Sequence, residues 1–215
     1  MKQASPERGG LLVVISSPSG GGKTAVVQGL LQRDPSTFVY SVTATTRPPR
    51  PGEREGVDYY FVSPTEFARM RDSGELIEWA EVHGFFYGTP RSSVEGPLRE
   101  GKVVLMAIDV KGGQAVRRLY PHCSLLVFIK PPSMRVLRER LMRRSTEGAQ
   151  EIEKRLQRAA MELAAARSYD HVVVNRELER TIERVAALIA AAKRAQARRE
   201  RTAQRGTRRL TSDAV

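Results

Sequence analysis

One glycine-rich segment constrains the fold of this chain more than any other. It is SPSGGGKT at residues 17–24, which directly follows the apolar run LLVVIS at residues 11–16 and directly precedes a helical pattern. A strand, a glycine-rich turn and a helix in this order are the context that a Walker A phosphate-binding loop requires. The segment therefore predicts a nucleoside triphosphate site at the end of a strand.

The residue types in this segment suit a bound phosphate. The glycines let the backbone wrap so that its N–H groups point at phosphate oxygens, and the following helix N-terminus adds a favourable dipole. Lys23 is expected to reach the β- and γ-phosphates, and Thr24 is expected to help hold Mg²⁺. Ser17 stands where the strict pattern has its first glycine. The predicted ATP-binding residues are Ser17, Pro18, Ser19, Gly20, Gly21, Gly22, Lys23 and Thr24.

Strand-like and helical patterns alternate along the rest of the chain. Further apolar runs lie at residues 38–42, 103–108, 124–129 and 171–174. Helical patterns lie at residues 23–32, 112–119, 133–143, 150–167 and from about 177. Continuous apolar runs fit a parallel sheet that is buried on both faces. The predicted fold class is therefore α/β, with a doubly wound parallel P-loop sheet as the core and helices on both faces.

Two segments interrupt this alternation. Residues 44–98 combine a loop rich in Pro, Gly and Arg with short aromatic strands and a helix start, at which Ser63 and Glu66 predict a capping box. We expect residues 44–98 to form an inserted subdomain. Residues 144–150 (RSTEGAQ) separate two helices and contain glycine and small polar residues, which favours a mobile flap.

Composition limits the class of protein. A chain of 215 residues can bury the core of one compact domain. The sequence has no apolar stretch long enough to span a bilayer and no secretory signal, so we expect a soluble, cytoplasmic protein. The single cysteine, Cys123, lies in an apolar run and is predicted to be buried rather than disulfide-bonded. The three histidines have no metal-ligand spacing, so no zinc site is indicated.

The basic residues are unevenly distributed. The formal net charge is +12, and about half of it comes from residues 193–215, which hold eight Lys or Arg and two Asp or Glu. This segment has no apolar stripe, which predicts a fraying helix or a flexible, disordered tail. Charge alone does not separate a nucleotide partner from a nucleic acid, so nucleic-acid binding by the tail stays open.

From residue 41 the sequence is SVTATTRPPRPGEREGVDYYFV, and TTRPPRPGE closely resembles the segment by which guanylate kinases hold the phosphate of GMP. Arg47 and Arg50 offer planar guanidinium groups that suit phosphate oxygens, and the two prolines between them stiffen the loop. The resemblance implies that Tyr59 and Tyr87 donate their hydroxyls to the same phosphate. Glu53 either belongs to the GMP site directly or braces Arg50.

The resemblance extends to the position that selects the base. Glu78, in GELIEWAEVHG, stands where the family uses a carboxylate to accept hydrogen bonds from guanine N1–H and the N2 amino group, a donor pair that adenine lacks. The alternative is that Glu78 caps a turn or forms a salt bridge near Trp79. Thr43 and Thr89 fall at positions where the family commonly has serine. The implied GMP-binding residues are Thr43, Arg47, Arg50, Glu53, Tyr59, Glu78, Tyr87 and Thr89.

The same resemblance implies the catalytic residues. The strand in VVLMAIDVKGG ends at Asp109, a Walker B-like position for orienting a magnesium-bound water or an arginine. Ala107 replaces a second acid that many members carry. The segment RERLMRRSTEGAQEIEKRL at residues 138–156 resembles the family's arginine-rich lid, with Ser145 in place of the usual glycine. The implied catalytic residues are Lys23, Arg140, Arg144, Arg155 and Asp109; Thr24 and, through water, Asp109 would hold Mg²⁺, and Asn175 would lie near adenine.

The resemblance covers roughly residues 9–190 and predicts a domain organisation. The guanylate kinase-like domain spans residues 9–192, with a core at 9–43 and 99–192, a GMP-binding insertion at 44–98 and a lid at about 138–156. The implied reaction is Mg²⁺-dependent transfer of the γ-phosphoryl group of ATP to GMP in purine nucleotide metabolism, by a monomer or a homodimer.

Three other classes compete with this interpretation. Non-catalytic scaffold modules that resemble guanylate kinases typically lose the ATP loop, which this chain keeps. A P-loop protein that acts on nucleic acid fits the charge but leaves TTRPPRPGE and Glu78 without a role. A kinase of another nucleoside monophosphate shares the architecture but lacks the carboxylate at the position of Glu78.

Overall fold

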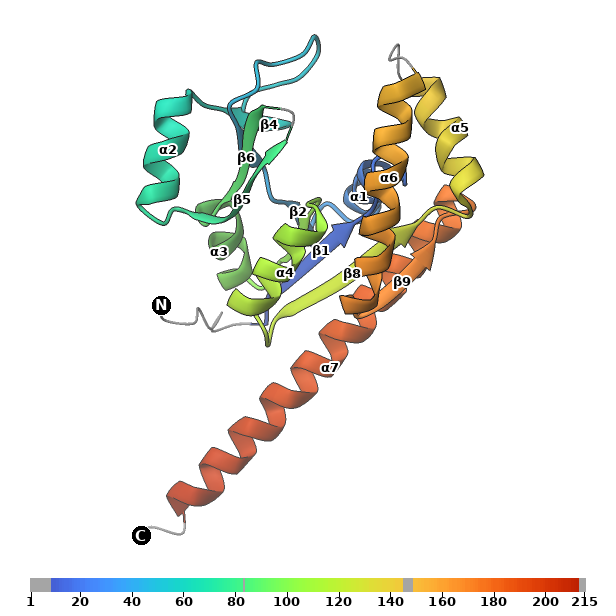
Figure 1. The fold of residues 1–215 in the computed structure, drawn as a ribbon. Helices are drawn as coiled ribbons and strands as arrows, with labels where there is room; N and C mark the ends of the chain where they lie inside the picture. The colour runs from blue at the N-terminus through green and yellow to red at the C-terminus, as the bar shows by residue number, and fades with distance from the viewer. Residues whose placement is uncertain (1–8, 83, 145–148, 213–215) are drawn as a thin grey trace.

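A five-stranded parallel sheet forms the centre of the protein (Figure 1). The computed structural model describes residues 9–82, 84–144 and 149–212. The sheet has the order β2-β7-β1-β8-β9, and each neighbouring pair is parallel. The strands are β1 (Leu11–Ser16), β2 (Phe38–Tyr40), β7 (Val103–Met106), β8 (Ser124–Lys130) and β9 (His171–Val174). The predicted α/β class with a parallel sheet is confirmed.

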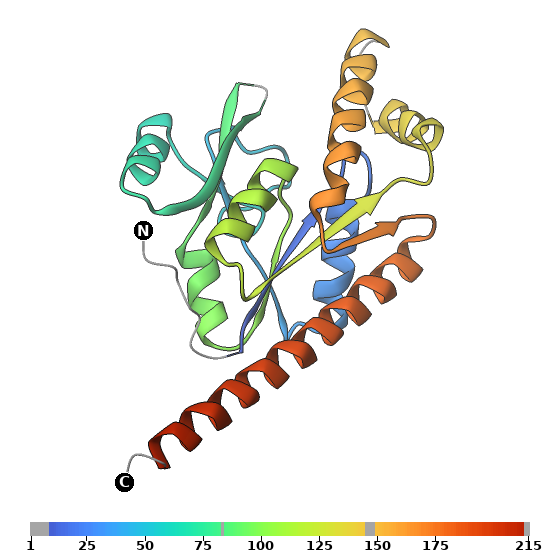
Figure 2. The same cartoon turned by 60° about the horizontal axis from the view of Figure 1, so that its bottom comes forward.

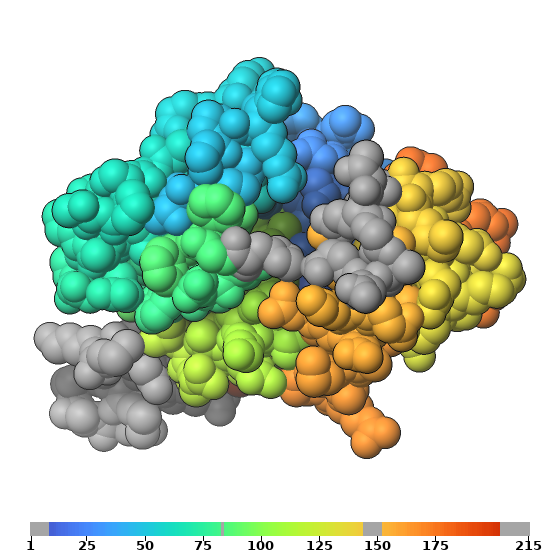
Figure 3. Space-filling model, turned by 45° about the horizontal axis from the view of Figure 1, so that its top comes forward, coloured from blue at the N-terminus to red at the C-terminus, as the bar shows by residue number. Residues whose placement is uncertain are grey.

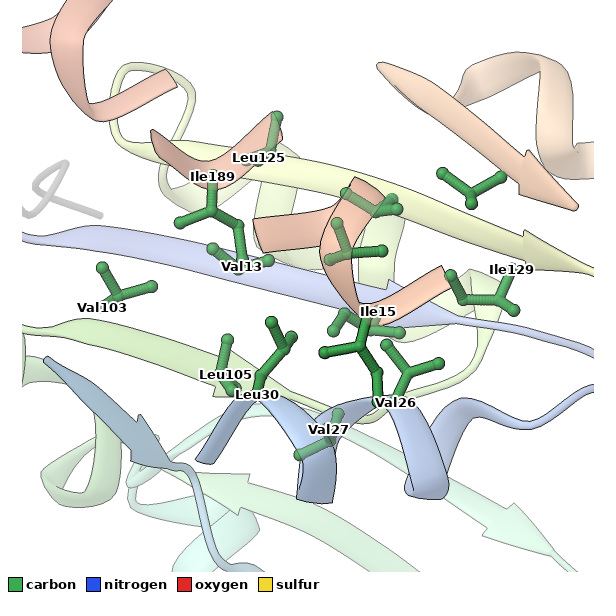
Figure 4. Close-up of a cluster of buried hydrophobic side chains, with 14 of the residues drawn as sticks. Val13, Ile15, Val26, Val27, Leu30, Val103, Leu105, Leu125, Ile129 and Ile189 are labelled. Atoms are coloured by element: carbon green, nitrogen blue, oxygen red, sulfur yellow. The ribbon is translucent and has the colours of Figure 1, made fainter. Parts of the chain in front are cut away.

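Helices cover both faces of this sheet. Val13 and Ile15 of the central strand β1 pack on one face with helices α1 (Lys23–Arg33) and α7 (Leu178–Ser212), and Figure 4 shows this cluster. Leu12 and Val14 pack on the other face with α3 (Ser92–Arg99) and α4 (Val110–Leu119). Because β1 is buried on both faces, its apolar run is continuous rather than alternating.

The segment that interrupts the alternation builds a second, four-stranded sheet in the order β4-β3-β6-β5. Its elements are β3 (Thr43–Thr45), β4 (Tyr59–Phe61), α2 (Pro64–Asp72), β5 (Leu76–Val82) and β6 (Phe85–Pro90). The single strand that the sequence predicts at residues 38–42 stops at Tyr40. The N–H of Ser41 donates to the carbonyl of Leu105 in the core, and the chain then enters the second sheet at Thr43.

One half of the predicted capping box is present at the start of α2. The hydroxyl of Ser63 accepts a hydrogen bond from the N–H of Glu66 over 3.1 Å, as a helix N-cap does. The carboxylate of Glu66 instead forms an ion pair with Arg69. The sequence therefore located the beginning of the helix correctly.

Two antiparallel helices follow β8 and stand beside the phosphate loop (Figure 1). They are α5 (Met134–Arg144) and α6 (Ala149–Ala165), and the short 3₁₀ helix η1 (Ala166–Ser168) follows. Their contact is a small apolar core of Leu137, Leu141, Ile152, Leu156 and Ala159. Residues 145–148 of the predicted flap lie outside the described residues, so its mobility stays a prediction.

The basic segment after residue 192 continues helix α7 as far as Ser212. The first turn of this basic segment is attached to the core. Lys193 Nζ donates to the carbonyl of Gly101 over 3.2 Å, and Gln196 Nε2 donates to the carbonyl of Gly10 over 3.1 Å. Beyond them the helix extends away from the sheet (Figures 1 and 2). The sequence missed these two attachments; flexibility of the tail stays a prediction.

Two further findings concern membrane-spanning helices and the single cysteine. Within the described residues, no helix combines the length and the apolar character needed to cross a membrane. Cys123 is only 3% exposed, and burial raises the pKa of its thiol to about 11. Its predicted location in the core is therefore confirmed.

Candidate active site

The phosphate loop connects the central strand β1 to helix α1. Gly20 and Gly22 have φ angles of 82° and 103°, in the left-handed region that residues with a side chain rarely adopt. Space around the loop is also restricted. A Cβ atom at Gly20 would lie 3.2 Å from Leu141 and 3.3 Å from Leu137 of α5, so α5 packs directly against the loop. These two glycines let the backbone wrap at the carboxyl edge of the sheet, where ligands of open α/β folds bind.

Asn175 follows β9 and is hydrogen-bonded to the phosphate loop. It is 5% exposed, its Nδ2 donates to the carbonyl of Gly21 over 3.0 Å, and its Oδ1 accepts from the Thr181 hydroxyl of α7 over 3.1 Å. A Cβ atom at Gly22 would clash with the same amide group. The sequence predicts Asn175 near adenine. In the structure both ends of its amide bind protein groups, so we interpret it as a residue that positions the loop.

Lys23 lies at the first position of α1, and its ammonium group is directed toward the end of β7. Nζ donates to the carbonyl of Ile108 over 3.4 Å. Burial lowers the pKa of Lys23, and the nearby carboxylates of Asp109, Glu162 and Glu78 partly offset this effect. The charges of three acids, at the N-cap of α4, on α6 and on β5, thus act on one lysine of the phosphate loop.

Glu162 also belongs to this group, and it is not among the site residues predicted from the sequence. It is half-buried on α6, and its charge also interacts with Asp109 and Arg158. A signal was present in the sequence. Glu162 follows Arg155 by seven residues, and a spacing of seven places two residues on the same face of a helix. A catalytic assignment to Arg155 therefore predicts that Glu162 faces the same site.

Asp109 performs a structural task at the start of α4. Its Oδ1 accepts the N–H of Gly112 over 2.8 Å, which makes it the N-cap of the helix. This fixes the carboxylate at the carboxyl edge of the sheet, near Lys23. Thr24, the second predicted metal residue, is exposed at the first turn of α1.

The predicted GMP-phosphate residues of the insertion converge on Arg47. Its Nη2 donates to both carboxylate oxygens of Glu53, over 2.8 and 2.9 Å, and its guanidinium lies 5.3 Å from the centre of the Tyr59 ring. Burial lowers the pKa of Arg47, but hydrogen bonds to Glu53 and Tyr87 raise it overall. The rings of Tyr59 and Tyr87 meet edge to face with their centres 6.0 Å apart. Arg47, Tyr59 and Tyr87 are therefore brought together as predicted.

Glu53 does act as a brace, but its main partner differs from the one that the sequence suggests. Its carboxylate binds the side chain of Arg47 and contacts Arg50 only through the main-chain N–H, over 2.8 Å. The side chain of Arg50 is exposed at the tip of the loop. A bidentate pair with Glu53 holds Arg47 in one orientation, whereas Arg50 is left accessible to solvent.

Glu78, on β5, is hydrogen-bonded to the neighbouring strand of the second sheet. The Thr89 hydroxyl, on β6, donates to Glu78 Oε1, on β5, over 2.6 Å. Burial raises the pKa of Glu78 to about 7; the Thr89 hydrogen bond and Lys23 oppose this shift, and Asp109 adds to it. Trp79 lies on the opposite face of β5, where its ring contacts Arg71. Thr43 is half-buried at the start of β3, paired in register with Tyr59.

The predicted lid arginines lie on α5 and α6. Arg140 Nη2 donates to the backbone carbonyl of Asn175 over 3.2 Å, beside the phosphate loop. Arg155 is half-buried on α6. The side chain of Arg144 and the whole of Ser145 lie outside the described residues.

Viewed from the carboxyl edge of the sheet, the insertion and the α5–α6 pair lie on opposite sides of the molecule (Figure 3). The phosphate loop, Lys23 and Asp109 belong to the core between them. A phosphate loop at the switch point of a parallel sheet, with an arginine-bearing insertion on one side and an arginine-bearing helix pair on the other, defines a P-loop kinase that acts on nucleotides.

Comparisons with known proteins identify the branch of this class. The guanylate kinase family model matches residues 10–192. The chain is 45% identical over 195 residues to a guanylate kinase of Chelativorans sp. (strain BNC1), covering 89% of each sequence. It is 48% identical over 184 residues to one of Rhodococcus jostii (strain RHA1), covering 85% of this chain and 88% of the relative. This chain belongs to the guanylate kinase family and is a nucleoside monophosphate kinase.

The fold comparison agrees. The crystal structure of guanylate kinase from Anaplasma phagocytophilum superposes with a TM-score of 0.70 at 38% identity, over 86% of each chain. The family resemblance predicted from the sequence is therefore confirmed.

Proposed function

We propose that this enzyme transfers the γ-phosphoryl group of ATP to GMP, with ATP on residues 17–24 and GMP on the insertion. Phosphotransfer between ATP and GMP is the activity of the family to which the chain belongs. One observation supports this placement of ATP on the core and GMP on the insertion. The charge of Glu78, on the insertion, interacts with the charges of Lys23 and Asp109, in the core. The proposed base-reading group and the phosphate-binding group therefore share one site.

The chain supplies positioning and charge rather than a nucleophile. A phosphate oxygen of GMP attacks the γ-phosphorus in line, so the reaction forms no covalent bond to the protein. Lys23 and the arginines of α5 and α6 stabilise the charge that develops on the transferred group. Arg47, oriented by Glu53, and the exposed Arg50 hold the GMP phosphate together with Tyr59 and Tyr87. Closure of the insertion and the helix pair would exclude water and align the reactants.

The residues fit a magnesium ion held mainly by the ATP phosphates. Mg²⁺ prefers oxygen ligands, and the exposed hydroxyl of Thr24 adjoins the phosphate loop. One oxygen of Asp109 accepts the Gly112 N–H in the α4 cap, and this cap holds the carboxylate at the carboxyl edge of the sheet. When bound, the ion would neutralise charge on the β- and γ-phosphates. We propose that Thr24 holds it directly and that Asp109 acts through water.

The remaining expectations follow from this function. A kinase that consumes GMP would serve purine nucleotide metabolism in the cytoplasm, either as a monomer or as a homodimer. The basic end of α7 lies on the amino-terminal side of the sheet, because Gln196 donates to the carbonyl of Gly10, just before β1. We therefore assign the tail no role in phosphotransfer.

The test is a panel of acceptors combined with one substitution. The wild-type enzyme is incubated with ATP, Mg²⁺ and each nucleoside monophosphate, and ADP release is followed. Glu78 accepts two donors from guanine and meets a mismatched edge on adenine, so kcat/KM for GMP is expected to exceed that for AMP by about ten-thousandfold. Glu78→Gln places a donor in the site, which should greatly reduce GMP use and narrow the ratio to AMP.

Glu81→Gln is the matched control, because Glu81 is exposed on the same strand and undergoes the same chemical change. It should leave the GMP-to-AMP ratio unchanged. A Glu78→Gln enzyme that keeps the wild-type ratio would show that guanine is recognised elsewhere, with Thr43 and Thr89 as the next residues to replace.

A further inference from the structure

The carboxylate of Glu78 packs against the first turn of α4, a helix of the core. A Cβ atom at Gly112 would lie 2.8 Å from Glu78 Oε2, 3.2 Å from its Cδ and 3.1 Å from Ile108 Cδ1. Separations below 3.0 Å are essentially never observed for real Cβ atoms, so a side chain at Gly112 would require Glu78 or the helix to move. The contact crosses from the insertion to the parallel sheet domain.

The backbone gives no reason for glycine at this position. Gly112 lies within α4 and is not among the glycines with positive φ angles. In a helix, glycine is less favourable than alanine by about 1 kcal/mol. The unfavourable residue is therefore explained by space: it is the absence of a side chain that allows Glu78 to approach.

Glu78 is constrained from two sides. On one side the Thr89 hydroxyl donates to Oε1 over 2.6 Å. On the other side Oε2 lies against Gly112. The N–H of Gly112 is bound to Asp109, so the same helical turn carries the cap near Lys23 and forms the surface behind Glu78.

We propose that Gly112 is a positioning residue for guanine selection. The missing side chain on α4 sets the depth at which the Glu78 carboxylate lies, so the selectivity of the insertion depends on a helix of the core. This inference rests on the proposed role of Glu78 as the reader of the base. It assigns Gly112 no contact with either substrate.

The first test is Gly112→Ala. The added methyl group displaces Glu78, so GMP affinity measured by calorimetry without ATP should fall by about ten- to hundredfold, and the GMP-to-AMP ratio in kcat/KM should narrow. KM for ATP should stay within about twofold of wild type, because the phosphate loop is untouched. Gly96→Ala is the control: it makes the same change in helix α3, where a Cβ atom would have no neighbour within 4 Å.

The second test is compensation. Glu78→Asp shortens the side chain by one methylene and should restore part of the room that Gly112→Ala removes. The double variant is therefore expected to bind GMP more tightly than the two single losses predict if they add. If Gly112→Ala alone fails to fold, a folded double variant that binds GMP supports the proposal, and an unfolded one overturns it.

Other outcomes separate this proposal from the role of Glu78. A folded Gly112→Ala enzyme with wild-type GMP affinity and selectivity overturns the positioning role, even where Glu78→Gln abolishes selectivity. Conversely, if Glu78→Gln leaves the GMP-to-AMP ratio unchanged, the proposed recognition of guanine by Glu78 is wrong. Gly112→Ala should then leave this ratio unchanged as well.

Discussion

In the proposed mechanism, the ionisation of Glu78 would make recognition of guanine depend on pH. Burial raises the pKa of its carboxyl group to about 7, whereas an unperturbed glutamate has a value of 4.5. Only the ionised form can accept hydrogen bonds from both guanine donors, because a proton on the carboxyl group would face a donor. At neutral pH a substantial fraction of the empty enzyme therefore holds Glu78 in the form that does not suit GMP.

KM for GMP should rise as the pH falls below 7. The increase in KM should approach about tenfold for each unit by which the pH is lowered, since one proton must leave Glu78 before GMP binds. The GMP phosphate also titrates near pH 6, so the measurement is a pH profile of KM in wild-type and Glu78→Gln enzymes. The phosphate contributes equally to both profiles, and the extra dependence should appear only in the wild type. Parallel profiles would refute a role for Glu78 ionisation.

The same shift predicts a cost in stability. The pKa of Glu78 is raised on folding, so its stabilising contribution is fully present below pH 4.5 and is lost as the pH rises through about 7. Glu78→Gln should therefore increase the free energy of unfolding of the ligand-free enzyme at pH 8 by about 1–3 kcal/mol, which would appear as a higher melting temperature. The gain should shrink toward pH 4.5 in calorimetric scans. An equal gain at both pH values would point to packing rather than charge.

At the scale of elements, the helix pair α5–α6 is expected to act mainly in the transition state. Arg155→Ala should lower kcat by about ten- to a hundredfold and change GMP affinity little, because a contact made on closure does not stabilise the open complex. Steady-state kinetics together with calorimetric GMP titration measure the two effects. Arg135→Ala, an exposed arginine on α5, is the control. Equal losses in kcat and affinity would indicate ground-state phosphate binding instead.

Local patterns predicted most of the elements. The strand before the phosphate loop, the loop itself and the helix cap at Ser63 follow from short-range rules, and each lies where those rules put it. The division of residues 38–45 between two sheets did not follow from them. It depends on the hydrogen bond from Ser41 to Leu105, which joins positions far apart in the sequence.

Partners of polar side chains were the least predictable part of the site. Asn175 was predicted to lie near adenine, and a motif cannot show that its amide is used by Gly21 and Thr181. Glu53 binds Arg47 rather than the side chain of Arg50, which depends on the conformation of the proline-containing loop. The approach of Gly112 to Glu78 links two elements that only the tertiary fold brings together.

At the scale of the whole molecule, the basic end of α7 should be separable from catalysis. Deletion of residues 203–215 should change neither turnover of GMP nor the melting temperature, since the hydrogen bonds from Lys193 and Gln196 that attach the described part of this segment to the core precede them. Deletion of residues 193–215 removes the hydrogen bonds of Lys193 and Gln196, each contributing about 0.5–1.5 kcal/mol, and should lower the melting temperature by several degrees.

Turnover should survive both deletions, because Gly10 and Gly101 lie at the amino-terminal edge of the sheet and the phosphate loop lies at the opposite edge. Kinetic assays at low and moderate salt measure this. Loss of activity in the shorter deletion at both salt concentrations would assign the tail a part in phosphotransfer.

The burial of Cys123 makes the protein a ready background for fluorescent labelling. It is the only cysteine in the sequence, it is 3% exposed, and burial raises the pKa of its thiol to about 11, so the nucleophilic thiolate is scarce near neutral pH. New cysteines at Val57 of the insertion and Met142 of α5, which are 48% and 58% exposed, would react first. A donor and acceptor dye at these positions would report the distance between the insertion and the α5–α6 pair during single turnovers, without removal of the native thiol.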